Sequence, residues 1–221
     1  MITTAYGPHE VVEEAARALQ KLRPAISWTP KMVVTAMELS SSPAVGDPPA
    51  GQMLRVLPVK ETPQAVPAGL CNDVLLAEEA VVEKLTDYHV AFKKDVGLYD
   101  PQETRESHRQ AMEAFIATCE VYVWQVGADI AAVSTAGRAL ADVGRGIQLV
   151  YTSPPHRRRG CAAALVATIG AALNERGLRT CLNADPRGAH GAKRLYEKLG
   201  FANQGLMQQV RFSELAPEPC A

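Results

Sequence analysis

Two periodicities alternate along the chain and predict its helices and strands. Apolar residues recur every three to four positions in His9–Lys21 and Glu78–Val96, which is the spacing of amphipathic helices. A further helix is expected from Asp100-Pro101 onward, because Asp can cap a helix and Pro suits its first position. Strands are predicted where aliphatic and β-branched residues cluster: Met32–Leu39, Met53–Leu57, Val121–Val126, Ile130–Val133, Ile147–Thr152, Arg179–Asn183 and Leu206–Phe212.

The pattern is most regular in the second half of the chain. A tight turn at Gly127-Ala128-Asp129 predicts a β-hairpin over Val121–Val133. Two more helices, each ended by a glycine, are expected beyond it: Arg159–Arg176 before Gly177, and His190–Leu199 before Gly200. From residue 73 the predicted order is α-α-β-β-β-α-β-α-β.

The first 66 residues differ from the rest in organisation. Their predicted helix and strands are separated by loops rich in Ser, Gly and Pro, and Glu61–Gly69 has the composition of a linker. We therefore expect a small N-terminal α+β domain or lid over residues 1–66, a second domain over residues 67–215 and a tail over residues 216–221. Residues 1–66 carry no motif with a recognisable chemistry.

The composition is that of a globular protein with a net charge close to zero. Apolar residues make up 47% of the 221 residues and charged residues 21%, which is enough to bury a core. The net charge of -1 provides no field that would hold a polyanion, so any basic site must be local. The longest nearly apolar run, Cys161–Leu173, is shorter than the ~20 residues that span a membrane. We expect no contact with membranes.

The N-terminal residues and the cysteines bear on the compartment. Met1–Tyr6 contains neither a basic start followed by an apolar core nor an Arg-rich segment, so we expect a cytoplasmic protein. The five cysteines are widely spaced and form no C-x-x-C pair, which favours free thiols over a disulfide framework. The same spacing predicts no metal site.

One segment, Leu149–Ala162, combines features of an anion-binding site. A predicted strand leads through Pro154-Pro155 into a basic loop, Arg157–Gly160, that opens a helix. The free N–H groups and the dipole at a helix N-terminus favour a negative ligand, and small residues allow it to approach closely. The loop lacks both G-K-[ST] and G-x-G-x-x-G, so it is neither a Walker loop nor a dinucleotide fingerprint. Alternatively, the three arginines form an ordinary solvated charge run.

Two motifs in this order resemble the GCN5-related N-acetyltransferases (GNAT). The acetyl-CoA loop of that family, Q/R-x-x-G-x-G/A, is matched by Arg157-x-x-Gly160-x-Ala162, and its helix ending L-Y-x-x-L-G-F is matched by Leu195–Phe201. The resemblance covers about residues 68–215. Val150-Tyr151-Thr152 before the loop is similar to larger bacterial members with a degenerate N-terminal domain. The resemblance implies a GNAT-like α/β fold, with a mixed, mostly antiparallel sheet and helices on both faces.

The resemblance also implies roles for individual residues. Acetyl-CoA would be the co-substrate, and no metal would be needed. The main chain of Val150, Tyr151 and Thr152 would pair with the pantetheine arm like an added strand. Tyr196 would be the catalytic acid, protonating the departing thiolate. Arg157 would brace the loop, and the pyrophosphate would be bound by the amides of the residues that follow it: Arg158, Arg159, Gly160, Cys161 and Ala162.

Two positions depart from the family pattern. Family members often carry a Glu on the strand before the loop that takes a proton from the acceptor amine, whereas Ile147–Val150 contains no titratable side chain. Gln148 can orient an amine but cannot take its proton, so the general base is unidentified. The family's Asn seven residues before the Tyr is replaced by Ala189. His89, His108 and Glu120 are substitute bases or, alternatively, packing and surface residues.

Other interpretations of the same loop are weaker. Cys161 at a helix N-terminus suggests a nucleophile, but the sequence provides no oriented base for it. A nucleic-acid module would use the arginines, but no aromatic residue lies between Arg157 and Arg179 to stack on bases. We expect no nucleic-acid partner.

The expected function is acetyl transfer from acetyl-CoA to an amine by direct attack. The alternative is a non-catalytic sensor that binds acetyl-CoA or CoA, which the missing Glu and Asn favour. The acceptor, a small-molecule or protein amine, would meet the helices at Glu78–Val96 and Pro101–Glu120. Acidic side chains outnumber basic ones there by nine to five, which mildly favours a cationic acceptor. The sequence indicates no oligomeric state.

Overall fold

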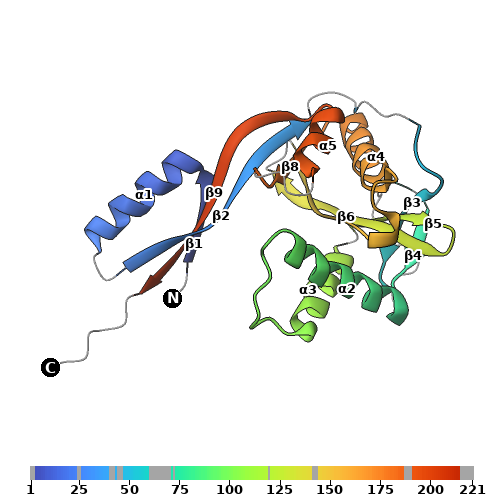
Figure 1. Ribbon diagram of the computed structural model, residues 1–221, viewed down its shortest axis with the longest axis horizontal. Helices are drawn as coiled ribbons and strands as arrows, with labels where there is room; N and C mark the ends of the chain where they lie inside the picture. The colour runs from blue at the N-terminus through green and yellow to red at the C-terminus, as the bar shows by residue number, and fades with distance from the viewer. Residues whose placement is uncertain are drawn as a thin grey trace. The chain divides into compact units, whose positions relative to one another are not determined.

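The computed structural model describes residues 3–23, 26–39, 43, 47–59, 71, 73–118, 120–140, 144–186 and 191–214. Along the chain its helices and strands (Figure 1) are β1 (Thr3–Pro8), α1 (His9–Leu22), β2 (Ile26–Leu39), β3 (Gln52–Leu57), β4 (Val74–Leu76), α2 (Glu79–Asp95), α3 (Arg105–Ala117), β5 (Val121–Val126), β6 (Asp129–Leu140), β7 (Gly144–Thr152), a short 3₁₀ helix (Pro154–His156), α4 (Cys161–Glu175), β8 (Arg179–Ala184), α5 (Ala192–Lys198) and β9 (Ala202–Glu214).

The described residues form two compact units, and each unit is built from segments that are separate in the sequence. The smaller unit takes its residues from 1–37, 183–194 and 203–221, and the larger from 38–182 and 195–202. Within the larger unit β3 pairs with both β4 and β5. The expected boundary near residue 67 and the expected tail over 216–221 lie outside the described residues, so the division at residue 67 stays a prediction.

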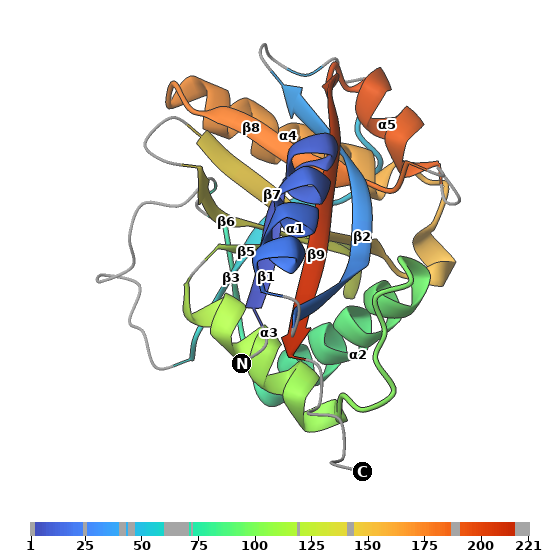
Figure 2. The same cartoon turned by 90° about the vertical axis from the view of Figure 1, so that its left-hand side faces the viewer.

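The smaller unit is a sheet with one helix on its face. Strand β9 lies between β1 and β2, and it pairs antiparallel with β1. Helix α1 lies along this sheet (Figures 1 and 2). Val12 and Ala16 of α1 are buried with Val210 of β9, as the helical periodicity predicted, whereas Val11 and Leu22, which were expected on the same apolar face, are exposed.

The larger unit has the layered fold that the GNAT resemblance implies. Its strands follow the order β8-β7-β6-β5-β3-β4. The pairs β3–β5, β5–β6 and β6–β7 are antiparallel, whereas β3–β4 and β7–β8 are parallel. Helices α2 and α3 lie on one face of this sheet and α4 on the other (Figure 1). The expected mixed, mostly antiparallel sheet with helices on both faces is confirmed.

Alternation along the strands sends side chains into both layers. Val121 and Val123 of β5 are fully buried in one cluster with Leu85 of α2 and Met112 of α3. Their neighbour Tyr122 is equally buried and, by the period of two along a strand, lies on the α4 face. The sheet is therefore apolar on both sides, which fixes the register of its strands.

One expected helix begins later than its sequence suggested. Helix α3 starts at Arg105 rather than at Pro101, and its N-cap is Thr104, whose hydroxyl accepts from the amide of Ser107 at 3.1 Å. The carboxylate of Asp100 instead accepts from the amide of Gln102 at 2.9 Å. Asp side chains stabilise turns and N-caps by the same kind of hydrogen bond, so the motif alone does not separate the two.

Candidate acyl-CoA site

Strand β7 loses its pairing with β8 halfway along its length. The parallel pairing runs from Gly144 opposite Arg179 to Ile147 opposite Leu182 and then ends, although β7 continues to Thr152. On its other edge β7 stays paired with β6 as far as Thr152. The edge of residues 148–152 that faced β8 is therefore left without a strand partner in the described residues, and Val150, Tyr151 and Thr152 lie on this edge.

A bulge at Leu149 accompanies this divergence. Leu149 has φ +51°, and here two residues of β7, Leu149 and Val150, oppose one of β6, because Tyr151 pairs with Val133 and Gln148 with Thr135. Such a bulge bends a strand and leaves one residue out of the ladder. Leu149 is nevertheless 6% exposed and belongs to the cluster under α2 and α3. The pattern of apolar residues gave no signal for this bend.

The loop after β7 opens the N-terminus of α4. Gly160 is the N-cap residue with φ +83°, and Arg158 has φ +61°, so both lie in the left-handed region. No side chain among the described residues caps α4, and its first helical hydrogen bond runs from the amide of Ala164 to the carbonyl of Gly160. The amides of Cys161, Ala162 and Ala163 are thus free to bind an acceptor, and the helix dipole favours an anion.

Arg157 is tied to the protein on three sides. Its Nε donates to the carbonyl of Thr152 at 3.1 Å, and its Nη2 lies 2.7 Å from Oδ2 of Asp95 at the end of α2. The guanidinium also lies over the ring of Tyr151, 5.5 Å from its centroid. These contacts are compatible with the bracing role that the family resemblance implies for Arg157, which stays a prediction. All three arginines of the loop, Arg157, Arg158 and Arg159, are exposed.

Cys161 does not have the environment of an activated thiol. The residue is 2% exposed, and burial raises the pKa of its thiol, with a smaller opposing effect from Arg159. A catalytic cysteine needs a lowered pKa and an accessible sulfur. The geometry favours the role of Cys161 as a backbone donor at the helix start over the nucleophile alternative.

Tyr196 lies in the core at the end of α5. It is 6% exposed, and its ring packs against Phe201 with centroids 5.9 Å apart. Burial raises the pKa of its phenol far above the ordinary value, so the hydroxyl keeps its proton at any physiological pH. No hydrogen bond, ion pair or ring contact joins Tyr196 to residues 149–162 in the described part of the chain. Its acid role stays a prediction.

Gln148 occupies the strand position before the loop. Opposite residues of a ladder share a face, and Gln148 pairs with Thr135, two residues from the cluster member Val133. Its side chain therefore lies on the same face as α2 and α3, and it is partly exposed. An amide at this point can accept or donate a hydrogen bond but cannot take a proton.

The three substitute bases are held in two different places. His89 and His108 face each other between α2 and α3, with ring centroids 5.2 Å apart. His108 is 3% exposed and its Nε2 lies 3.7 Å from Oε2 of Glu103. Glu120 accepts from the hydroxyl of Tyr122 at 3.0 Å. Burial of His89 and, secondarily, the neighbouring His108 lower the pKa of His89, so it is neutral near pH 7.

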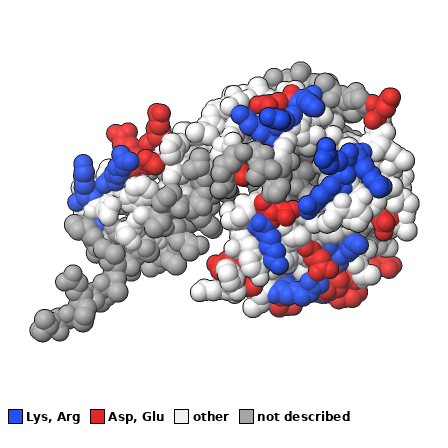
Figure 3. Space-filling model, in the orientation of Figure 1, with Lys and Arg blue, Asp and Glu red and all other residues white. Residues whose placement is uncertain are grey.

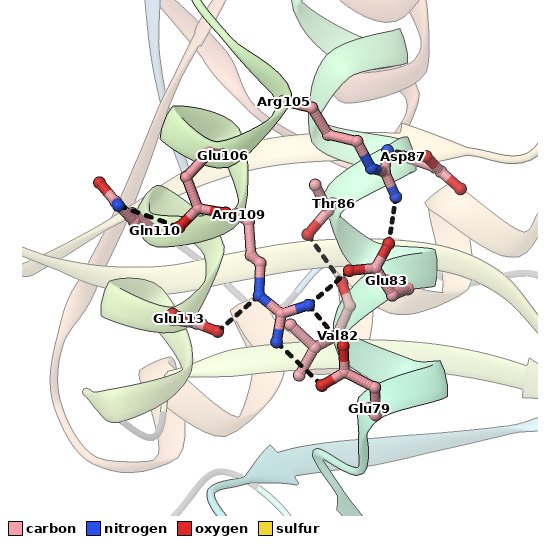
Figure 4. A network of polar contacts seen from close by, with 10 residues as sticks. All are labelled: Glu79, Val82, Glu83, Thr86, Asp87, Arg105, Glu106, Arg109, Gln110 and Glu113. Atoms are coloured by element: carbon pink, nitrogen blue, oxygen red, sulfur yellow. Dashed lines mark hydrogen bonds and ion pairs between the residues drawn. The ribbon is translucent and has the colours of Figure 1, made fainter.

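Most carboxylates of α2 and α3 are paired with arginines (Figure 4). Arg109 contacts Glu79 at 2.6 Å and Glu113 at 3.0 Å, and it also binds Glu83. Arg105 contacts Asp87 at 2.5 Å and likewise binds Glu83. On the surface around these helices both signs of charge are interspersed (Figure 3). These pairs connect the two helices, so the excess of carboxylates gives little support to a cationic acceptor, which stays a prediction.

A comparison with protein families identifies the domain. Residues 117–203 match the sequence model of the acetyltransferase (GNAT) domain. Residues 117–203 thus belong to a GNAT domain. The match includes β5–β8, the loop at Gly160 and Tyr196, so the family resemblance of the two motifs is confirmed. No curated protein matches the chain.

Solved structures of GNAT proteins share the fold at low sequence identity. A GCN5-related N-acetyltransferase from Sphaerobacter thermophilus is 17% identical with a TM-score of 0.59, and the match covers 100% of this chain and 62% of that one. A GNAT-family acetyltransferase from Colwellia psychrerythraea is 11% identical with a TM-score of 0.58, and the match covers 96% of this chain and 65% of that one. A GCN5-related N-acetyltransferase from Kribbella flavida is 17% identical with a TM-score of 0.53, and the match covers 94% of this chain and 67% of that one. The chain thus spans about two thirds of the length of these relatives.

The lowered pKa of His89 predicts that stability falls in mildly acidic solution. Because the folded protein disfavours protonated His89, the unfolded chain binds more protons once the pH falls below the ordinary value of about 6.5. We expect the free energy of unfolding, measured in urea, to decrease between pH 7.5 and pH 5.5, and to decrease less in His89→Leu. The paired carboxylates, whose pKa values are lowered, titrate below this window. An equal decrease in both proteins would show that His89 is not responsible.

Proposed function

We propose that the GNAT domain binds acetyl-CoA and transfers its acetyl group to an amine. The observation that carries the proposal is the unpaired edge of β7 at residues 148–152, which leads directly into the uncapped N-terminus of α4 at Gly160. The edge suits a chain of amides such as the pantetheine arm, and the helix start suits a pyrophosphate. The described residues of this site thus fit the ligand that the GNAT family uses.

The proposed ligand contacts come mainly from the backbone. The main chain of Val150 and Thr152 would bind the pantetheine amides, and the amides of Arg158 through Ala162 would bind the pyrophosphate. The exposed arginines 158 and 159 would add positive charge beside the phosphates. A site made of backbone groups depends on loop conformation more than on side-chain identity, which is why a loosely matched motif suffices.

The proposed reaction is a direct attack of the amine on the thioester. The nitrogen forms a bond to the acetyl carbon, the carbon–sulfur bond breaks, and the nitrogen loses one proton while the sulfur gains one. Tyr196 would supply the proton or hydrogen bond to the sulfur, and its raised pKa keeps the phenol protonated for this purpose. Gln148 would orient the amine. The rate enhancement would then come largely from positioning of the two reactants.

A sensor that binds acetyl-CoA without turnover is the alternative. The observation in its favour is Gln148, an amide with no proton-accepting power, on the face where the acceptor would lie. A screen of small amines and peptide N-termini with acetyl-CoA, followed by thiol release and mass, separates the two. Acetylation of any amine supports the enzyme, whereas tight binding without turnover on the whole panel supports the sensor.

Substitution at Gly160 tests the pyrophosphate site. In Gly160→Asp the new carboxylate would lie at the start of α4 and compete for the free amides, so we expect CoA to bind at least about tenfold more weakly by calorimetry. Gly177→Asp is the matched control, because Gly177 has a similar φ of +72° and open space around it. Equal CoA affinity in Gly160→Asp and the parent would contradict the proposed site.

Substitution at Tyr196 tests the acid role. General acid catalysis contributes about 10²–10⁴-fold, so Tyr196→Phe should lower kcat by about a hundredfold while the KM for acetyl-CoA stays within about twofold. Tyr99→Phe, which changes an exposed tyrosine, is the control and should behave like the parent. Thiol release with an accepted amine gives both constants. Unchanged kcat in Tyr196→Phe would remove the acid role and leave the binding proposal intact.

A further inference from the structure

Asp95 stands at a position that helix physics disfavours. It is the last residue of α2, where the helix dipole repels negative charge and where the preceding Lys93 and Lys94 are the favoured residue types. A residue that breaks a local rule is expected to serve a contact elsewhere. Asp95 forms such a contact with Arg157, 62 positions further along the chain, with 2.7 Å between Asp95 Oδ2 and Arg157 Nη2.

Arg157 transmits this contact to the acetyl-CoA loop. Its Nε donates to the carbonyl of Thr152, the last residue of β7, so one guanidinium connects α2 with the strand end. Arg157 is also the residue directly before Arg158, which has φ +61°. A non-glycine residue in this region is strained and persists only where its surroundings hold it. The anchor on Asp95 and Thr152 fixes the first residue of this strained loop.

The stacking of Tyr151 completes the connection. The Arg157 guanidinium lies over the Tyr151 ring, and that ring packs against Tyr88 of α2 with centroids 5.1 Å apart. Tyr88 in turn donates to the carbonyl of Ile130 on β6 at 2.6 Å. Helix α2 is therefore attached to the end of β7 by an apolar contact through Tyr88 and by an ionic one through Asp95.

We propose that Asp95 is a positioning residue of the acetyl-CoA site, which acts by holding Arg157 on the carbonyl of Thr152. The inference rests on the proposed function and adds the acceptor-side helix α2 to the determinants of acetyl-CoA affinity. Arg157 then serves as a brace and not as a phosphate ligand. If Arg157 instead left Asp95 to bind the pyrophosphate, removal of the Asp95 charge would release it and strengthen CoA binding. The two roles thus predict opposite changes in CoA affinity.

Calorimetry with CoA on Asp95→Asn distinguishes these roles. We expect a Kd about three- to tenfold higher than in the parent, as fits the loss of a partly exposed ion pair. We also expect an unchanged or slightly higher stability in urea, since a charge unfavourable to the helix C-terminus is removed. A merely structural role would instead lower stability. Asp95→Glu should restore most of the affinity.

Asp87→Asn is the matched control. Asp87 lies two turns earlier on α2 and is paired with Arg105, away from the loop, so its removal should leave the Kd unchanged. Arg157→Lys keeps the charge but cannot contact Thr152 and Asp95 with one planar group, and it should weaken CoA binding with no further loss when combined with Asp95→Asn. Equal or tighter CoA binding by Asp95→Asn would overturn the inference. A parent that binds no CoA would overturn the proposed function and the inference with it.

Discussion

The end of the β7–β8 pairing at Ile147 and Leu182 is the feature on which the candidate site depends. Up to this point the two parallel strands satisfy each other's backbone groups. Beyond it the bulge at Leu149 bends β7, and one edge of the strand turns into a row of backbone donors and acceptors without a strand partner in the described residues. The unpaired N–H and C=O groups at the edge of a sheet can form hydrogen bonds with a strand of another chain. In this domain the edge leads into a helix start with free amides, so a ligand with amides and phosphates can satisfy both.

This geometry requires backbone conformations that are costly by themselves. Leu149 and Arg158 are non-glycine residues with positive φ, each costing about 1 kcal/mol. The burial of the Leu149 side chain under α2 and α3 offsets the first cost. The contacts of Arg157 with Thr152 and Asp95 offset the second cost, because they stabilise the backbone next to Arg158. Helix α2 thus contacts the loop through Asp95, and the arginine–carboxylate pairs between α2 and α3 hold these two helices together.

Local patterns were sufficient for the elements and for the loop. Glycines with positive φ form the turn at Gly127, the helix ends at Gly177 and Gly200 and the loop at Gly160. Glycine adopts this conformation readily, so its positions in the sequence indicate such turns. The start of α3 was predicted too early because Asp100 stabilises a turn, while Thr104 is the cap. The loop could be proposed as an anion-binding site from the sequence because its residues are consecutive.

Features that join distant segments could not be predicted from the sequence. The bend at Leu149 arises from pairing with β6 and lies at an ordinary apolar residue. Arg157 lies 62 positions from Asp95, with which it is paired, and the pairing of Glu83 with Arg105 and Arg109 depends on how α2 packs on α3. Those pairs also show why a count of carboxylates gives little support to a cationic acceptor, which stays a prediction, because a charge that serves a helix–helix contact offers little to a ligand.

Hydrogen exchange of the full chain with and without CoA tests the central claim most directly, because it reports on individual backbone amides. The claim is that the edge of β7 and the start of α4 bind one ligand with their main chain. CoA should slow exchange in two segments together, Val150–Thr152 and Arg158–Ala163, while Val121–Val126 in the centre of the sheet should be unaffected. Protection confined to one of the two segments, or absent from both at saturating CoA, would contradict the account.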